Sequence, residues 1–442
     1  MKRYLLLAAI VACLTALASL AACSDNPGTP RPQATSTATE TPTEPAVGGT
    51  PEPLPAALQE ILQQVAEVRG LEAPADLKAS LVSRADLPAL LEDLITDEDR
   101  EWFRQTTTLY RLLGHFTPDQ DYLTIYEGFG ASAVLGLYSP AHKQLWVVHE
   151  GQDIDFDTLP RSQKETLAHE LVHALQDEHF DLEASYEDVM NNLDREQAWT
   201  SVVEGDAVTH EQLYGQRYLS IPLGAGGGRL FLVADLAQIT DVPPSIAREL
   251  IFPYTTGAEW IRTIVEEEGA EAVDEMLQNP PLGTAYVLHP ELRGEGWEPR
   301  DVTLPDLSGA LGEGWERESG GTIGEFGWRN YLQLRTRAGE AGAAAAGWAG
   351  DAYEVYVEGE KSVAVFRISF RDPAEAQAFA QAQQSFITAA HAGTEQKGAI
   401  QFATFRTGYV TATTEVSGSE VLFAIGSSRE VAERAIEALA GG

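Results

Sequence analysis

The chain has little cysteine and little positive charge. Only two of its 442 residues are cysteines, Cys13 and Cys23, and both lie near the N-terminus. A disulfide framework is therefore excluded for the folded part, which has to rest on its hydrophobic core. Lys and Arg number 30 against 67 Asp and Glu, which gives a formal net charge of -37. This acidity argues against binding to nucleic acid phosphates, so we expect no nucleic-acid partner.

An apolar run from Leu5 to Leu20 follows Met1-Lys-Arg at the N-terminus. It is short for a helix that spans a membrane, which needs about 20 apolar residues. The residues after it, Leu20-Ala-Ala-Cys23, resemble the lipobox of bacterial lipoproteins. We expect a signal peptide over residues 1–22, and a lipid on Cys23 that anchors an exported protein on the extracytoplasmic side of a membrane. An ordinary secretory signal with an incidental cysteine is the alternative.

Residues 23–55 contain mostly Pro, Thr, Ser, Gly and Glu, with hardly any large apolar side chain. Such a segment cannot bury enough surface to fold, so we predict a disordered tether. A flexible coil of this length would hold the folded part tens of ångströms from the membrane.

The strongest chemical signal is a His-Glu-x-x-His run formed by His169, Glu170 and His173. Residues four apart on a helix lie one above the other, so the two histidines can place two ring nitrogens on one metal ion. Two imidazoles suit Zn²⁺ at about 2.0–2.1 Å, and a neighbouring carboxylate can take a proton from a water molecule. The flanking apolar residues repeat at helical spacing, and Ser162 with Glu165 predicts a capping box at the start of the helix. The pattern therefore predicts a zinc site, with Glu170 as the proton acceptor.

A catalytic zinc site needs a third protein ligand. Glu204 lies in a second helical stretch and is the favoured candidate. His179 is the alternative, because its spacing fits the metzincin pattern except that Gln176 stands where that pattern has glycine. Without the glycine, the helix would carry His179 to another face. Asp206 is a candidate for a residue that orients a histidine, with a solvated turn residue as the other interpretation.

These motifs resemble the gluzincins, the clan of thermolysin-like and minigluzincin peptidases, over roughly residues 131–218. The resemblance implies a zinc peptidase in which a glutamate of a following helix completes the site. It also implies that an edge strand just before the active helix binds the substrate backbone. We expect this strand in a hairpin made by residues 131–138 and 144–148. Two further segments, 252–257 with 279–291 and 347–353, are similar to segments of largely uncharacterised exported proteins with the same helix.

A gluzincin also uses a donor that stabilises the oxyanion formed when water attacks a peptide carbonyl. The candidates in this chain are Tyr254, Tyr286 and His289. Each of them also has a plain structural interpretation, because Pro-Tyr and His-Pro pairs mark turns.

The rest of the chain predicts an α+β protein with two folded parts. Residues 56–340 should form a helix-rich, zincin-like catalytic domain with a small β-sheet, and residues 341–442 a compact α+β domain. Helices are expected over 56–69, 98–113, 196–219, 244–250 and 258–278, and residues 304–321 should be irregular. In the C-terminal domain, strands are expected over 353–358, 362–370, 400–405, 408–414 and 421–425, with helices from 373 to about 391 and after Ser427. His391 stands alone there and predicts no site.

The function that fits these features is a membrane-anchored, zinc-dependent peptidase that acts on peptides or proteins outside the cytoplasm. A non-catalytic surface protein that uses a peptidase-like domain for binding is the alternative.

Overall fold

The computed structural model describes residues 49–133, 135–151, 154–190, 192–222, 242–405, 407–414 and 416–441. The predicted signal peptide, Cys23 and most of the predicted tether lie outside the described residues. The end of the tether does not, because Glu52–Pro53 pair with a strand of the first sheet and Leu54 is buried in the core below it. The folded part therefore begins a few residues before Ala56.

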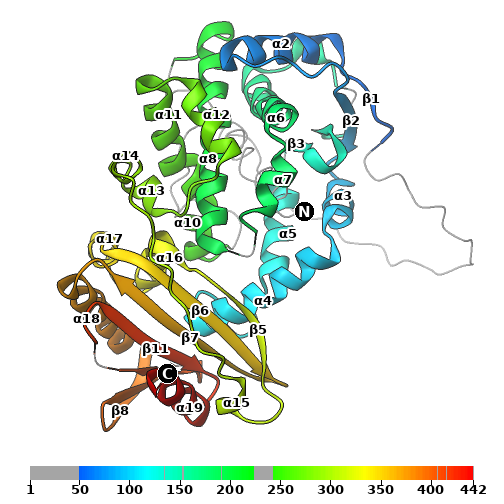
Figure 1. The fold of residues 1–442 in the computed structure, drawn as a ribbon. Coiled ribbons are helices and arrows are strands. Elements are labelled where there is room, and N and C mark those ends of the chain that lie inside the picture. The colour runs from blue at the N-terminus through cyan, green and yellow to red at the C-terminus, as the bar shows by residue number, and fades with distance from the viewer. Residues whose placement is uncertain are drawn as a thin grey trace, which may run out of the picture.

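The N-terminal part is helix-rich with one small sheet (Figure 1). Its first elements are β1 (Glu52–Pro53), α2 (Ala56–Arg69), β2 (Lys78–Ser83), α3 (Leu87–Leu94), α4 (Asp97–Leu113), α5 (Tyr122–Ala133), β3 (Gly136–Ser139), η3 (Pro140–His142), β4 (Gln144–His149) and η4 (Phe156–Thr158). The following helices are α6 (Arg161–Phe180), α7 (Leu182–Glu187), α8 (Leu193–Tyr218), α10 (Pro244–Phe252), η5 (Pro253–Gly257), α11 (Ala258–Glu267), α12 (Ala270–Gln278), α13 (Ala285–Leu288) and α14 (Glu291–Glu295).

The C-terminal part is built on a larger sheet. Its elements are α15 (Ser308–Leu311), β5 (Glu316–Gly321), α16 (Gly324–Leu332), α17 (Ala338–Ala345), β6 (Trp348–Glu358), β7 (Lys361–Phe370), α18 (Pro373–Ala390), β8 (His391–Lys397), β9 (Ile400–Phe405), β10 (Val410–Thr413), β11 (Glu420–Gly426) and α19 (Arg429–Gly441). The predicted α+β class is confirmed, with a small sheet among the N-terminal helices and a larger sheet in the C-terminal part.

The small sheet has the strand order β1-β2-β4-β3, with β2 parallel to β4 and the outer pairs antiparallel. One face packs on α2 and α6 through Leu145 and Val147, and the other packs on α3 and α4 through Trp146 and Val148. The predicted hairpin is therefore present, but its first strand is shorter than expected. Helix α5 continues to Ala133, and the strand begins only at Gly136.

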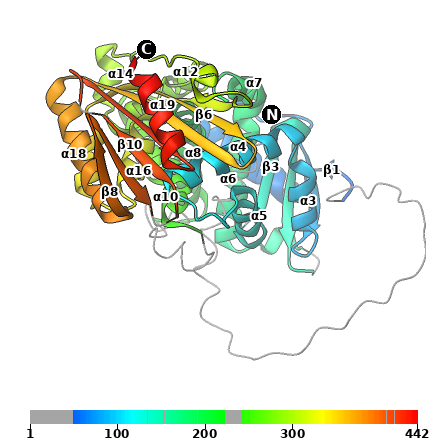
Figure 2. The ribbon, with the colours of Figure 1, turned by 90° about the horizontal axis from the view of Figure 1, so that it is seen from below.

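The large sheet is antiparallel and has the order β5-β6-β7-β11-β10-β9-β8. Along β7, Val363 and Val365 pack on α19, whereas Phe366 and Ile368 pack on α16 and α18, as strand alternation requires. Figure 2 shows this sheet with α18 and α19 beside it. The irregular segment predicted over 304–321 was wrong in its last part, because Glu316–Gly321 form the edge strand β5. The sheet therefore begins at residue 316, before the expected boundary at 341.

The start of α6 differs from expectation. The predicted capping box at Ser162 is wrong, because α6 begins at Arg161 after Pro160, and no side chain caps it. The carboxyl group of Glu165 instead turns toward Gly215 of α8. The last helix is capped by Ser428, whose Oγ accepts a hydrogen bond from the Val431 amide.

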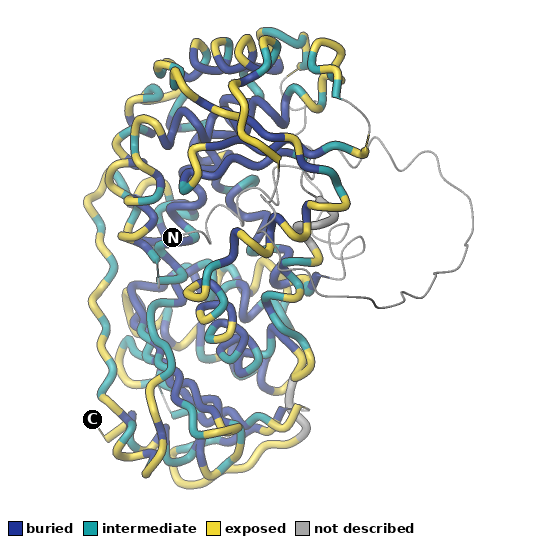
Figure 3. The backbone as a smooth tube through the Cα atoms, turned by 90° about the vertical axis from the view of Figure 1, so that its right-hand side faces the viewer, coloured by how far each residue is buried: buried dark blue, intermediate teal, exposed yellow. Residues whose placement is uncertain are grey.

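The two parts share one hydrophobic core. Trp328 and Tyr331 of α16 are fully buried, and the Trp328 ring meets Phe366, Phe379 and Phe423 of the C-terminal sheet and α18 at centroid distances of 5.5–5.8 Å. The same core includes side chains of α3, α4 and α5. In Figure 3 buried segments run through the middle of both parts, while exposed segments follow the outer turns. Helix α16 therefore joins the parts through packing.

The Trp328→Ala variant should lower the free energy of unfolding by about 3–5 kcal/mol, because it leaves a large cavity between α16 and the sheet. Denaturant unfolding measures this change. Leu282→Ala is the control, because Leu282 is exposed and its loss should change stability by less than about 0.5 kcal/mol. Equal stability of both variants would contradict a shared core.

Candidate metal centre

The candidate site lies between α6 and α8, which pack side by side (Figure 1). Along α6 all residues from Glu165 to Asp177 are buried, so the helix passes through the interior rather than along the surface. The histidines of α6 face the middle of α8, where the buried run from Ala198 to Glu211 includes Glu204. A hydrophobic cluster of α2, α6 and α8 residues surrounds this contact and keeps the two helices together.

The structure brings His169, His173 and Glu204 together, and all three side chains are buried. The Nε2 atom of His169 lies 3.1 Å from Oε2 of Glu204 and 3.2 Å from Nε2 of His173. The third side of this triangle, from His173 Nε2 to Glu204 Oε2, measures 3.5 Å. Each of the three residues thus points one ligand atom at the same small space.

The other ring nitrogen of each histidine has an acceptor as its partner. Nδ1 of His169 lies 3.1 Å from a carboxylate oxygen of Glu211, and Nδ1 of His173 lies 2.8 Å from Oε1 of Gln176. The Gln176 amide is oriented by its Nε2, which donates to the Val203 carbonyl and to Asp206. Both imidazoles therefore donate through Nδ1, and when they are neutral each presents an Nε2 lone pair to the triangle.

This donor set fits a divalent metal ion. Three ligand atoms held at about 2.0–2.1 Å from one zinc ion in tetrahedral geometry lie roughly 3.3–3.4 Å apart, close to the observed distances. Without a metal ion or a proton among them, two nitrogen lone pairs and a carboxylate oxygen would repel one another in a buried space. Glu204 and Glu211 supply two negative charges that balance a divalent cation, and the second oxygen of each has no hydrogen-bond partner within the described part of the chain.

Electrostatics at the triangle favour positive charge. Burial alone would lower the pKa of His169, but hydrogen bonds with Glu204 and Glu211 outweigh it and raise the pKa to about 10. Burial alone would raise the pKa of Glu204, but the neighbouring histidines lower it to about 2. Both shifts have the same cause, a buried acid and base that attract each other. A bound dication would take the place of the proton.

Glu170 lies beside the triangle and is held by β3. Its Oε2 accepts a hydrogen bond of 2.9 Å from the backbone amide of Tyr138, and its Oε1 has no hydrogen-bond partner among the described residues. Burial raises the pKa of Glu170 to about 7, against the opposing effect of His173. A carboxylate with a pKa near neutrality can both accept and return a proton.

Two further contacts fix β3 against α6. The Tyr138 hydroxyl donates to Asp177, and a Cβ atom at Gly136 would lie only 3.2 Å from Cγ of Glu170. Glycine at this position therefore allows the strand to approach the helix closely. As the last strand of its sheet, β3 pairs with β4 on one side and turns its other edge toward α6.

Asp206 acts on the site through Gln176. Its Oδ2 accepts hydrogen bonds from Gln176 and from the buried Arg69, at 2.8 and 2.9 Å. Arg69 also pairs with Asp274 of α12. Burial alone would raise the pKa of Asp206, but the positive charge of Arg69 holds this pKa well below its usual range. Asp206 therefore helps to orient His173, in agreement with the first of its two interpretations.

Of the three oxyanion candidates, the structure brings only Tyr254 to the histidines. Its ring stacks on His169 with a centroid distance of 6.2 Å and an angle of 19°. Tyr254 lies in the π-helical turn η5. This turn packs tightly on α8 through two glycines, since a Cβ atom at Gly205 or at Gly257 would collide with the other segment. Such turns recur at functional sites.

The other candidates have different partners. His289 Nε2 lies 2.8 Å from Glu325 of α16, and the Tyr286 hydroxyl donates to the Trp297 carbonyl. Neither arrangement supports a role in catalysis. His179 is exposed and donates to the Glu72 carbonyl, so the metzincin alternative finds no support in the geometry.

The sequence interpretation missed Glu211, and it considered Gln176 only as a departure from a pattern. Glu211 follows Glu204 by seven residues, which is about two helical turns and places both acids on one face of α8. The seven-residue spacing could therefore have predicted that Glu211 lies on the same side of α8 as Glu204. The role of Gln176 was not visible, because it depends on contacts with Val203 and Asp206 of the other helix.

Comparison with known proteins adds information on the C-terminal part alone. Residues 313–435 match a family model described as a domain of unknown function, DUF8575. The match begins just before β5, in agreement with a sheet that starts at residue 316. No curated protein and no solved structure matches the chain. Within the described residues, no helix has both the length and the apolar character needed to cross a bilayer.

His169→Ala, His173→Ala and Glu204→Ala should each lose stoichiometric zinc, because two remaining ligands hold the ion weakly. Metal analysis of the purified variants measures this loss. His179→Ala is the matched control and should retain its zinc. Loss of zinc in the control, with retention in Glu204→Ala, would assign the third ligand to His179.

Glu211→Gln should weaken zinc binding about 10–100-fold, because His169 loses the carboxylate that orients its ring. A competition titration against a chelator of known affinity measures the change. The exposed Glu187 of α7 provides the control variant Glu187→Gln, which should bind zinc as the wild type does. Unchanged affinity in Glu211→Gln would show that this contact has no influence on the metal.

Proposed function

We propose that the protein is a zinc-dependent peptidase. The observation that carries this proposal is the convergence of the Nε2 atoms of His169 and His173 with a carboxylate oxygen of Glu204. The carboxyl group of Glu170 lies beside them and can accept and return a proton. Three protein ligands with an open position are typical of catalytic zinc sites, whereas structural sites have four.

The neighbouring strand supports a peptide as the substrate. Because β3 is the last strand of its sheet, its outer edge pairs with no strand of the described sheet, and one backbone group on this edge, the Tyr138 amide, binds Glu170. A peptide that lies along β3 would therefore pass directly by the triangle of His169, His173 and Glu204. Tyr254 lies on the His169 side of the same space.

In the proposed reaction, His169, His173 and Glu204 hold the ion. A bound zinc ion supplies Lewis acidity, which polarises a carbonyl group and makes water easier to deprotonate. Glu170 accepts the proton of the attacking water, and the water oxygen forms a bond to the carbonyl carbon. Glu170 then passes the proton to the amide nitrogen as the carbon–nitrogen bond breaks. The Tyr254 hydroxyl is the proposed donor to the oxyanion.

The proposed location is the extracytoplasmic side of a membrane, with the protein anchored by a lipid on Cys23. The sequence pattern at residues 1–23 supports this part of the proposal. Mass spectrometry of the mature N-terminus tests it.

Glu170→Gln should retain stoichiometric zinc and lose at least about a thousandfold in turnover, because the amide cannot accept the proton. Hydrolysis of a denatured protein, followed by mass spectrometry of the products, measures turnover. The wild type should also lose activity with a chelator and regain it with zinc.

Full activity in Glu170→Gln would refute the proposal. A wild type that binds zinc but cleaves no member of a broad peptide library would favour a non-catalytic binding protein.

A further inference from the structure

A cavity adjoins the metal centre and is separate from the three metal ligands. It lies between α4, α8, α10 and α16 and has a volume of about 70 Å³. Tyr254 and Thr200 belong to its lining. Tyr254 also stacks on His169, and Thr200 precedes Glu204 by one helical turn. The cavity and the candidate site thus share a wall.

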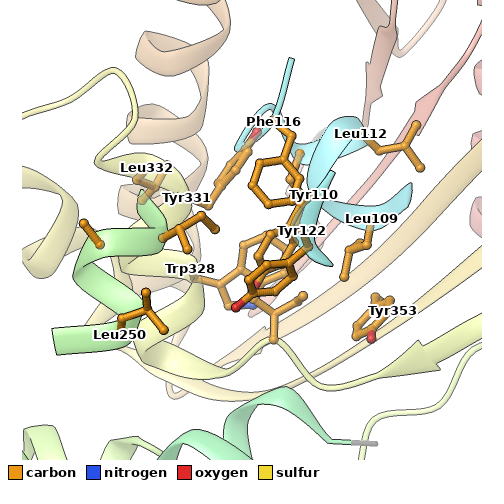
Figure 4. Close-up of a cluster of buried hydrophobic side chains, with 14 of the residues drawn as sticks. Leu109, Tyr110, Leu112, Phe116, Tyr122, Leu250, Trp328, Tyr331, Leu332 and Tyr353 are labelled. Carbon is orange, nitrogen blue, oxygen red and sulfur yellow. The ribbon is translucent and has the colours of Figure 1, made fainter. Parts of the chain in front are cut away.

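Most of the cavity wall is aromatic or aliphatic. Tyr110 and Tyr122 stack at a centroid distance of 5.6 Å, and Figure 4 shows both rings in the buried cluster that also contains Leu250 and Trp328. Tyr110, Tyr122 and Leu250 line the cavity. Such a wall suits the apolar stem of a side chain.

The carboxyl groups of Glu249 and Asp194 line the end of the cavity near the N-terminus of α8, away from Glu204. Both oxygens of Glu249 accept hydrogen bonds from the Tyr110 hydroxyl at 2.9 Å, and Tyr122 adds a third at 3.2 Å. Asp194 is 1% exposed, and its Oδ1 binds the Thr284 amide at 2.9 Å. Its Oδ2 has no hydrogen-bond partner among the residues that the structure describes.

These acids lack a positive partner in the described chain, where no Lys or Arg forms an ion pair with Glu249 or Asp194. Burial raises the pKa of each of these two carboxyl groups to about 7. Glu196 also lines the cavity and raises the pKa of Glu249 further by repulsion. A cation placed among these groups would remove the repulsion and stabilise their charged forms.

Glu196 and Glu204 are eight residues apart on α8, which corresponds to about 12 Å along the helix axis. A lysine or arginine side chain next to a scissile bond extends roughly 6–7 Å from its Cα atom. A side chain of this length that starts beside the metal centre would therefore extend about half of the way to Glu196, toward the acidic end of the cavity.

We infer that this cavity is the subsite for a lysine or arginine side chain next to the bond that is cleaved. The inference rests on the proposed function and names its substrate class. The aromatic wall would bind the stem, and Glu249 with Asp194 would bind the charged end. Thr200 and Tyr254 line the cavity on the side that faces the candidate metal centre.

A matched peptide pair tests the inference. The peptides differ only in lysine or norleucine at one position beside the scissile bond, so they share a similar stem and differ in charge. The wild type should show at least tenfold higher kcat/KM for the lysine peptide. Glu249→Gln should reduce this preference at least tenfold, because the lysine peptide loses the carboxylate that binds its ammonium group. The control is Glu259→Gln, an exposed acid of α11, which should keep the wild-type preference.

A binding measurement with the same protein does not depend on hydrolysis. Calorimetry should detect n-pentylamine binding to the wild type but not n-pentanol binding, and Glu249→Gln should lose the amine. If Glu249→Gln fails to fold, as judged by its melting curve, the comparison of amine and alcohol binding to the wild type still shows whether the protein binds the cationic group. Tyr122→Phe, which removes one hydrogen bond to Glu249 and keeps the ring, should alter amine affinity with the fold intact.

The outcomes separate the two proposals. Cleavage of both peptides at equal rates, with no amine binding, would overturn the subsite and leave the peptidase proposal standing. No cleavage of any peptide by zinc-loaded protein would overturn the peptidase and the side-chain subsite with it, and amine binding would then show only a cation site. Preference for lysine that Glu249→Gln does not change would overturn the assignment to this cavity.

Discussion

The contact between α6 and α8 is the constraint on which the candidate site depends. It places a carboxylate of one helix against two imidazoles of the other in a buried space, where bringing these groups together without a balancing charge costs free energy. Hydrogen bonds to Glu211 and Gln176 hold the rings so that both Nε2 atoms face inward. A cation in this space would balance the negative charge of Glu204 and Glu211, so the packing of α6 on α8 also provides the electrostatic basis of the proposed chemistry.

Contacts farther out make this arrangement rigid. Arg69, at the end of α2, bonds to Asp206, which in turn accepts from Gln176 and thereby holds His173. On the other side, β3 holds Glu170 through a backbone amide. The proposed proton acceptor and the proposed metal ligands are therefore held by contacts with different elements. The small sheet brings its edge strand β3 to α6.

The α+β class, the positions of the longest helices and the pairing of His169 with His173 were predictable, because hydrophobic periodicity and the His-Glu-x-x-His spacing are local features. Helix α2 matched its predicted bounds, and Asp372 begins α18 as expected by accepting bonds from two backbone amides. Strands β1, β2, β5 and β8 were missed, and so were helices such as α3, α5 and α16. The stability of these strands comes from pairing with segments distant in sequence or from edge positions, which local pattern does not record. The start of α6 was misjudged because Glu165 is used for packing against α8.

The sequence by itself determined that two histidines lie one above the other with a glutamate between them in the chain, because a helix of fixed pitch allows no other arrangement. It also determined that the folded part, which contains no cysteine, must rely on packing. Only the tertiary structure decided between Glu204 and His179, since that choice depends on which helix crosses the histidines. The same holds for Glu211, for the strand that holds Glu170, and for Tyr254, because each reaches the site through contacts between segments that are far apart in the sequence.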